Sequence, residues 1–185
     1  FKDITFENNS AKRGGVIYIN TNTDTTVDSC TFSSNKSTEW GGAIYVNNGS
    51  LTIKDSEFFS NKCTTTNNYG AGAIYVHCIG STVSIDNTLF DGHYGYNGGA
   101  IRGNKVKSIK ITGSTFSNNE GFQYGGAIAL AGGTVADKFI VSGSTFVNNI
   151  SGGTTNGGGA IYLSGDYNEV PEIINSVFHG NSTSK

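Results

Sequence analysis

Two short motifs alternate along the whole 185-residue chain, and this repetition limits the possible fold more than any other feature. In the first motif a Phe is followed three residues later by Asn, as in Phe32 and Asn35. The second motif is Gly-Gly-Ala-Ile, as in residues 41–44, with the variants GGVI at residues 14–17 and AGAI at residues 71–74. A Phe column recurs about every 29 residues, at Phe6, Phe32, Phe58, Phe90, Phe116, Phe146 and Phe178. A period of this length is typical of solenoid proteins.

The residues around each motif alternate between apolar and polar side chains, which is the period of a β-strand. Leu51 and Ile53 precede Phe58 by seven and five residues, and Ile44 and Val46 follow the preceding glycine pair. No segment has the apolar spacing or the length of a helix. Each repeat therefore predicts three short strands: one before the Phe, one around it and one after the glycines.

One repeat of this length cannot bury its own apolar face, whereas stacked repeats bury a continuous core. The sequence therefore predicts an all-β fold, a right-handed single-stranded parallel β-helix (solenoid) of about six coils with three short strands each. The right hand follows from the usual chirality of parallel crossovers. Residues 1–185 form a single domain in this interpretation. Because the pattern begins and ends within a repeat, we expect either part of a longer rod or fibre or a unit that stacks end to end.

Composition argues against several classes of function. The 27 glycines and the single proline fit a turn-rich β protein better than a helical one. The net charge of −2, with only 14% charged residues, argues against a nucleic-acid partner. No apolar run reaches the ~18 residues that a membrane-spanning helix needs. No cofactor-binding motif occurs either. We therefore expect no nucleic acid, no membrane span in this segment and no cofactor.

The three cysteines, Cys30, Cys63 and Cys78, lack a metal-binding spacing, so we expect no metal. Cys30 and Cys78 fall in inward columns that are typical of buried thiols, whereas Cys63 falls in a longer connection. A Cys63–Cys78 disulfide and free thiols are both left open. Glycosylation sequons occur about as often as chance predicts, and the possible acceptors are Asn48, in an expected loop, and Asn8.

Repeated columns also predict how the coils hold together. The residue three positions after each Phe would stack on its counterpart in the next coil and form an amide ladder, with the members Asn9, Asn35, Asn61, His93, Asn119, Asn149 and Asn181. Three positions before each Phe stand residues that favour a bend, several of which tolerate a positive φ: Asp3, Ser29, Asp55, Asn87, Gly113, Gly143 and Asn175. The glycine pair would open the next strand where the chain bends sharply.

This pair of motifs resembles the GGAI and FxxN repeats of the polymorphic outer membrane proteins of chlamydiae. Similar repeats occur in adhesin-like surface proteins of other microbes. The resemblance extends over all coils of the chain. It implies a secreted β-helix passenger or stalk, extracellular or displayed on a cell surface, that acts in attachment or as a structural fibre.

A series of aromatic residues near the glycine pairs is the candidate ligand- or partner-binding edge: Trp40, Tyr69, Tyr96, Tyr124 and Phe122. Exposed rings offer flat apolar faces to sugar rings, so a host or environmental glycan is one expected partner. The structural alternative is that these rings cover glycine backbone. A second outward column follows the motif Ile and is expected to be exposed, as a surface for lateral self-association: Tyr18, Tyr45, Tyr75, Arg102, Ala129 and Tyr162.

Polysaccharide lyases and polygalacturonase-like hydrolases also use this fold, so an enzyme is the competing hypothesis. Such a hydrolase needs clustered carboxylates, but neither column flanking the Phe stacks two acids on successive coils. A further column alternates in sign, which favours ion pairing: Lys2, Asp28, Lys54 and Asp86. The best catalytic-looking string is Asp91-Gly92-His93, followed by Arg102 and Lys105, but His93 occupies the Asn slot of the ladder. We therefore assign no catalytic residue.

These observations favour an extracellular structural or adhesive β-helix module of a cell-surface protein or filament. Its expected partners are identical rods, joined end to end or laterally, and glycans. The alternative is a carbohydrate-active enzyme or a glycan-binding module on a pectate-lyase-like fold.

Overall fold

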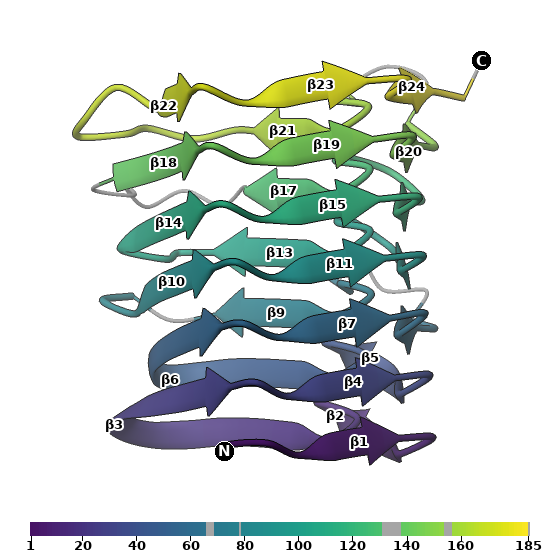
Figure 1. Cartoon of the computed structure of the whole chain (residues 1–185), viewed down its shortest axis with the longest axis vertical. Coiled ribbons are helices and arrows are strands. Elements are labelled where there is room, and N and C mark those ends of the chain that lie inside the picture. The colour runs from purple at the N-terminus through teal and green to yellow at the C-terminus, as the bar shows by residue number, and fades with distance from the viewer. Residues whose placement is uncertain (66–68, 78, 131–137, 154–156, 185) are drawn as a thin grey trace.

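The computed structural model describes residues 1–65, 69–77, 79–130, 138–153 and 157–184. These residues form parallel strands joined by turns, and none of them lies in a helix. The described part of the chain therefore offers no helix that is long and apolar enough to cross a membrane. The strands wind as a right-handed coil that rises from the N-terminus to the C-terminus (Figure 1). The predicted parallel β-helix is confirmed.

The Phe residues form the first of three sheets, which we call the phenylalanine sheet. Its strands lie in register, so that each Phe sits above the Phe of the previous turn, with ring centroids 4.5–4.9 Å apart. They are β1 (Thr5–Glu7), β4 (Thr31–Ser33), β7 (Glu57–Phe59), β11 (Leu89–Asp91), β15 (Thr115–Ser117), β19 (Thr145–Val147) and β23 (Val177–His179). Five of these strands pair on both sides. The coil thus has about five fully stacked turns, slightly fewer than the six expected.

The strands after the glycines and the strands before the Phe share a second sheet, which we call the long sheet. In the first two turns they are continuous, as β3 (Ile17–Asp28) and β6 (Ile44–Lys54). In later turns they are separate, so the sheet divides into two limbs (Figure 1). One limb contains β9 (Ile74–His77), β13 (Ile101–Asn104), β17 (Ile128–Leu130) and β21 (Ile161–Leu163). The other contains β10 (Thr82–Asp86), β14 (Ser108–Thr112), β18 (Lys138–Ser142) and β22 (Glu172–Ile174).

A third sheet is built by residues between each ladder Asn and the following glycine pair, where the sequence predicts no strand. Its strands are β2 (Ser10–Arg13), β5 (Lys36–Trp40), β8 (Lys62–Cys63), β12 (Tyr94–Gly95), β16 (Glu120–Gly121), β20 (Ile150–Ser151) and β24 (Ser182–Thr183). Several have only two residues, which is too short for an alternation of apolar and polar side chains to be visible in the sequence. The three predicted strand columns therefore exist but occupy two sheets, and the third sheet was not predicted.

Bends between the sheets follow the predicted turn chemistry. All seven residues that stand three positions before a Phe have φ between 43° and 57°. Asn, Asp and Gly reach this left-handed region at the lowest cost. Gly41, the first glycine of its pair, has the same need, since its φ is 59° and a Cβ there would lie 2.1 Å from the Ile44 carbonyl oxygen. These positions thus set the corners of the coil.

The structure places the predicted Asn column in a buried ladder inside one corner. Asn35 Nδ2 donates to Asn61 Oδ1 at 2.9 Å and to the Phe6 carbonyl at 3.0 Å. Asn119 Nδ2 likewise donates to Asn149 Oδ1 at 2.8 Å. The amides thereby satisfy backbone and side-chain groups that water cannot reach, which makes their contribution structural.

His93 interrupts this ladder without opening it. Its ring Nδ1 accepts a hydrogen bond from the Asn61 backbone N–H at 2.9 Å. The backbone N–H of His93 donates to Asn119 Oδ1 at 3.1 Å. Burial lowers the pKa of His93 to about 3, so the ring is uncharged at neutral pH. The Asp91 carboxylate instead accepts a hydrogen bond from the Ser117 hydroxyl at 2.6 Å. The Asp91-Gly92-His93 string therefore has its His committed to the core.

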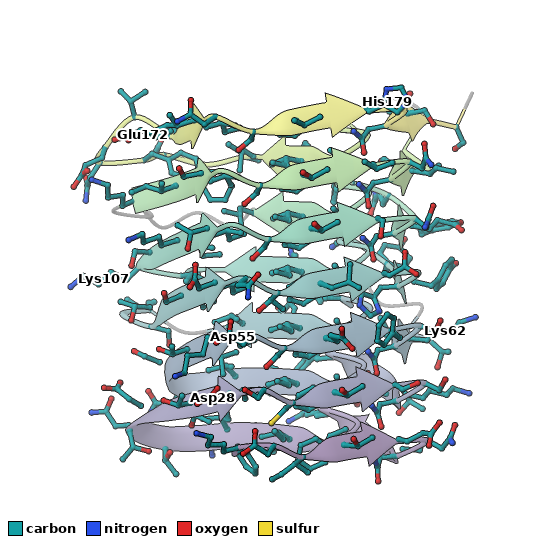
Figure 2. All side chains as sticks on the ribbon, in the orientation of Figure 1. Asp28, Asp55, Lys62, Lys107, Glu172 and His179 are labelled. Atoms are coloured by element: carbon teal, nitrogen blue, oxygen red, sulfur yellow. The ribbon has the colours of Figure 1, made fainter. Side chains whose placement is uncertain are left out.

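The charge-alternating column lies on the outside of the coil. Its member Asp28 lies along the same side in Figure 2 as Asp55, which directly follows the member Lys54. Asp28 Oδ2 lies 3.1 Å from Lys54 Nζ and 3.8 Å from Lys2 Nζ. The Lys54 ammonium holds the pKa of Asp28 below its usual value, chiefly through this hydrogen-bonded pair. Asp86 accepts a hydrogen bond from the Thr112 hydroxyl. These acids are thus engaged in pairing between turns.

Candidate ligand-binding cleft

The outward column of the long sheet is mostly buried, so the expectation that it is exposed is wrong. Strand register aligns its members from turn to turn: Tyr18, Tyr45, Tyr75, Arg102, Ala129 and Tyr162. Tyr45, Tyr75, Arg102 and Ala129 are each less than 5% exposed. Aromatic side chains from the neighbouring edge pack over part of this face, as Trp40 does against Tyr45 and Tyr75. Removal of these large rings from water favours the covered arrangement.

A cleft of about 600 Å³ opens in this covered face. It lies over β9, β13 and β21 of the long sheet and is lined by Trp40, Tyr69, Tyr75, His77, Asn97, Arg102, Asn104, Lys105, Tyr124, Tyr162 and Ser164. Two small residues interrupt the aromatic columns nearby: Asn97 stands where other turns carry Trp40 or Tyr124, and Ala129 stands between Arg102 and Tyr162. The hollow therefore forms where the repeat departs from its own pattern.

Stacked rings form two sides of the cleft. On one side Trp40 lies 6.0 Å from Tyr75, with an angle of 25° between the rings. On the other side Tyr124 and Tyr162 stack at 4.6 Å and 17°. Packed rings present flat and rigid apolar surfaces, which bind at a small cost in conformational entropy.

Arg102 is the buried charged group of the cleft. The residue is 4% exposed, and its Nε and Nη1 atoms have no hydrogen-bond partner among the described residues. Burial lowers the pKa of the guanidinium, while the nearby hydroxyls of Tyr75 and Tyr124 partly oppose this shift. The side chain therefore stays a cation that the protein does not neutralise.

Polar groups flank Arg102 on the same strands. Asn104 Nδ2 lies 3.0 Å from His77 Nδ1, and the Tyr75 hydroxyl lies 3.3 Å from the same atom. Burial, together with the positive charges of Lys105 and Arg102, lowers the pKa of His77. Among the described residues, the fixed charges of the lining are thus Arg102 and Lys105, and none of the lining side chains is a carboxylate.

The cleft brings together only part of the predicted aromatic edge. Trp40, Tyr69 and Tyr124 line it. Tyr96 and Phe122 instead pack against each other, with ring centroids 5.1 Å apart, outside its lining. Backbone register keeps Tyr96 out of the cleft lining. Gly98 pairs with Gly125, so Asn97, and not Tyr96, occupies the position that corresponds to Tyr124 in the next turn.

Sequence reasoning did not assign a ligand-binding role to Arg102, His77 or Asn104. The available signal was the single cation in a column otherwise made of Tyr and Ala. A cation on an exposed strand face is ordinary, so this residue indicates a binding site only once the structure shows that it is buried. No group of three or more His, Cys, Asp or Glu residues in the described chain is placed to hold a metal ion.

The cysteines and the possible glycosylation sites lie away from this cleft. Cys63 ends β8 rather than lying in a loop, so that expectation is wrong. Of the two alternatives left open, the structure shows the free thiol, which is buried and whose Sγ donates to the Glu39 carbonyl at 3.2 Å. Cys78 falls outside the described residues. Asn48 lies within β6 rather than in a loop, and its Oδ1 accepts a hydrogen bond from the Gly49 N–H at 3.0 Å. Asn8 is exposed in the bend after β1.

Comparison with known proteins bears on the repeat itself. The family model of the Chlamydia polymorphic membrane protein repeat matches residues 3–20, 29–47 and 143–164. Each matched segment contains one complete Phe motif and one glycine motif. No curated protein and no solved structure matches the chain. The resemblance seen in the sequence is therefore confirmed: this chain carries repeats of the Chlamydia polymorphic membrane protein type on a parallel β-helix.

Proposed function

We propose that this chain is a rigid section of a surface-displayed protein and acts as a structural or adhesive module. The proposal includes localisation at the cell surface, for which the matched repeat type is the support. The single observation that carries the binding role is the cleft on the outer face of the long sheet. Loops and outer faces of a repetitive scaffold are where such proteins present ligand-binding residues.

The scaffold suits display because its core is stacked from turn to turn. Phe32, Phe58, Phe90, Phe116 and Phe146 are fully buried and form one continuous column of rings. The Asn ladder fixes the adjoining corner through hydrogen bonds between turns. A surface residue on such a rod keeps its position relative to residues one or two turns away, which pre-organises a binding site.

The competing proposal of a carbohydrate-active enzyme gains no support from the cleft. A hydrolase of this fold needs two carboxylates that face the same glycosidic bond, and the part of the lining that the structure describes has none. Self-association, end to end or laterally, stays a prediction alongside the adhesive role.

Attachment of coated beads tests the adhesive function. Beads carrying the purified chain are expected to adhere to cultured epithelial cells or to glycan-coated surfaces above an albumin-coated control. A Trp40→Ala, Tyr124→Ala double variant removes one ring from each side of the cleft and should reduce attachment. Circular dichroism verifies that this variant keeps its β-structure. Attachment no greater than that of albumin beads on every surface would contradict the proposal.

A further inference from the structure

The contacts within the described chain do not explain why the guanidinium of Arg102 is buried without a partner for Nε and Nη1. A buried charge is costly unless it is paired or fully hydrogen-bonded. Arg102 leaves Nε and Nη1 unbonded, and no acidic side chain of the described chain forms an ion pair with it. The other arginine, Arg13, shows the contrast, since its Nε donates to Glu39 Oε2 at 2.7 Å.

The charges around Arg102 favour an anionic ligand. Lys105 adds a second cation to the lining. His77 does not compensate either cation, because its lowered pKa keeps it neutral at pH 7. Arg pairs with a carboxylate through two parallel hydrogen bonds, which are among the strongest in proteins. An entering carboxylate would complete bonds that the folded chain leaves unmade.

The remaining lining favours a ligand with both flat apolar faces and hydroxyl groups. The Trp40–Tyr75 and Tyr124–Tyr162 pairs supply rings on which a sugar ring can stack. Asn104, two residues after Arg102 on β13, adds an amide to the lining, and its Oδ1 has no hydrogen-bond partner among the described residues. The volume of about 600 Å³ lies within the usual range for small-molecule sites.

We propose that this cleft binds a pyranose that carries a carboxylate, with the carboxylate on Arg102 and the sugar ring on an aromatic side. Sialic acids and uronic acids share this chemistry and differ in their source. The inference rests on the proposed adhesive function for its biological role, because it names the ligand class that the outer face would recognise. The binding site itself can be tested without cells.

Titration with free sugars is the direct test. N-acetylneuraminic acid and glucuronic acid are each added to the purified 185-residue chain, with glucose as the neutral control, and binding is followed by calorimetry or NMR. At least one acid is expected to bind saturably and at least tenfold more tightly than glucose. The preferred acid identifies the source of the ligand. Equal affinities for the acids and glucose, or binding of none of them, would overturn the proposal.

Substitution of Arg102 tests the role of the cation. Arg102→Met should weaken binding of the acidic sugar by about tenfold to a hundredfold, the loss expected for a charge-assisted hydrogen bond. Lys110→Ala is the matched control, because Lys110 is an exposed cation on β14 outside the cleft lining. It should leave affinity unchanged. Retention of wild-type affinity by Arg102→Met would refute the assignment.

A second readout separates ligand binding from a structural role. If Arg102 serves a ligand, Arg102→Met should leave thermal stability unchanged or raise it, because an unpaired buried charge is removed. A lower melting temperature, together with unchanged sugar affinity, would show that the residue is structural and overturn the proposal.

Ser164 gives a variant that does not disturb the core. It is an exposed residue of the cleft lining. Ser164→Glu places a carboxylate beside the proposed anion site and should weaken binding of the acidic sugar, whereas Ser164→Gln, equal in size and neutral, should weaken it much less. Equal effects of the two variants would contradict an anionic ligand. Cell attachment that persists while both acids fail to bind would overturn the ligand class and leave the adhesive function standing.

Discussion

At the scale of single residues, this coil tolerates a change in its repeat when the new side chain keeps the hydrogen-bond acceptor that the ladder needs. His93 replaces an Asn of the ladder and still accepts from the backbone N–H of Asn61. The cost is a titratable group in a site from which water is excluded. The pKa of His93 falls to about 3 because burial disfavours the imidazolium. This substitution makes stability depend on pH.

Acidification should therefore destabilise the protein through His93. The unfolded chain takes up a proton near pH 6.5, whereas the folded chain does so only near pH 3, so the free energy of unfolding falls as pH drops below about 6.5. The loss attributable to His93 is about 2 kcal/mol at pH 5. Urea unfolding at pH 7 and pH 5 measures it. His93→Asn should lose less stability between these pH values, and exposed His179→Asn should behave as the wild type. The same loss in His93→Asn and the wild type would contradict this account.

At the scale of elements, short strands hold together because side-chain ladders supplement backbone pairing. The third sheet contains strands of two residues, such as β12 and β16, which pair through few hydrogen bonds. The Asn column that directly precedes these strands bonds each turn to the next. The sequence predicted this ladder from its repetition. It did not predict the strands, because two residues are too few to show a period.

Removal of one amide from the ladder should be far more damaging than removal of a surface amide. Asn119→Ala deletes the bonds of Nδ2 to the Phe90 carbonyl and to Asn149, and it leaves the buried His93 N–H without an acceptor. The expected loss in the free energy of unfolding is about 3 kcal/mol, measured by urea denaturation. Exposed Asn22→Ala should change stability by less than ~0.5 kcal/mol. Comparable losses in the two variants would mean that the ladder contributes little.

At the scale of the whole molecule, the protein is a quasi-one-dimensional stack in which each turn depends on its neighbours. Phe90 lies between Phe58 and Phe116, with its ring centroid 4.8 Å from each. Phe178 stacks on Phe146 alone and is 44% exposed. The energetic weight of one repeated residue should therefore vary with its place along the stack.

Truncation of the same residue type at two positions tests this dependence. Phe90→Ala should lower the free energy of unfolding of the 185-residue chain by about 3–5 kcal/mol, because it leaves a cavity between two rings. Phe178→Ala should cost less than half as much, because that side chain is only partly removed from water. Chemical denaturation of both variants gives the comparison. Equal losses would argue against nearest-neighbour stacking as the main source of stability.

The sequence by itself determined the β-helix, its stacked Phe and Asn columns and its bends. These features depend on local alternation and on turn chemistry, which recur in every repeat and so can be seen without the fold. Only the tertiary structure decided which outward residues are covered. Arg102 and Tyr75 become buried because side chains from other turns and from the neighbouring edge pack over them. The cleft opens because Asn97 and Ala129 are small where the next turn carries the rings of Tyr124 and Tyr162. Burial on an outer face depends on contacts between distant residues, which the spacing within one repeat does not encode.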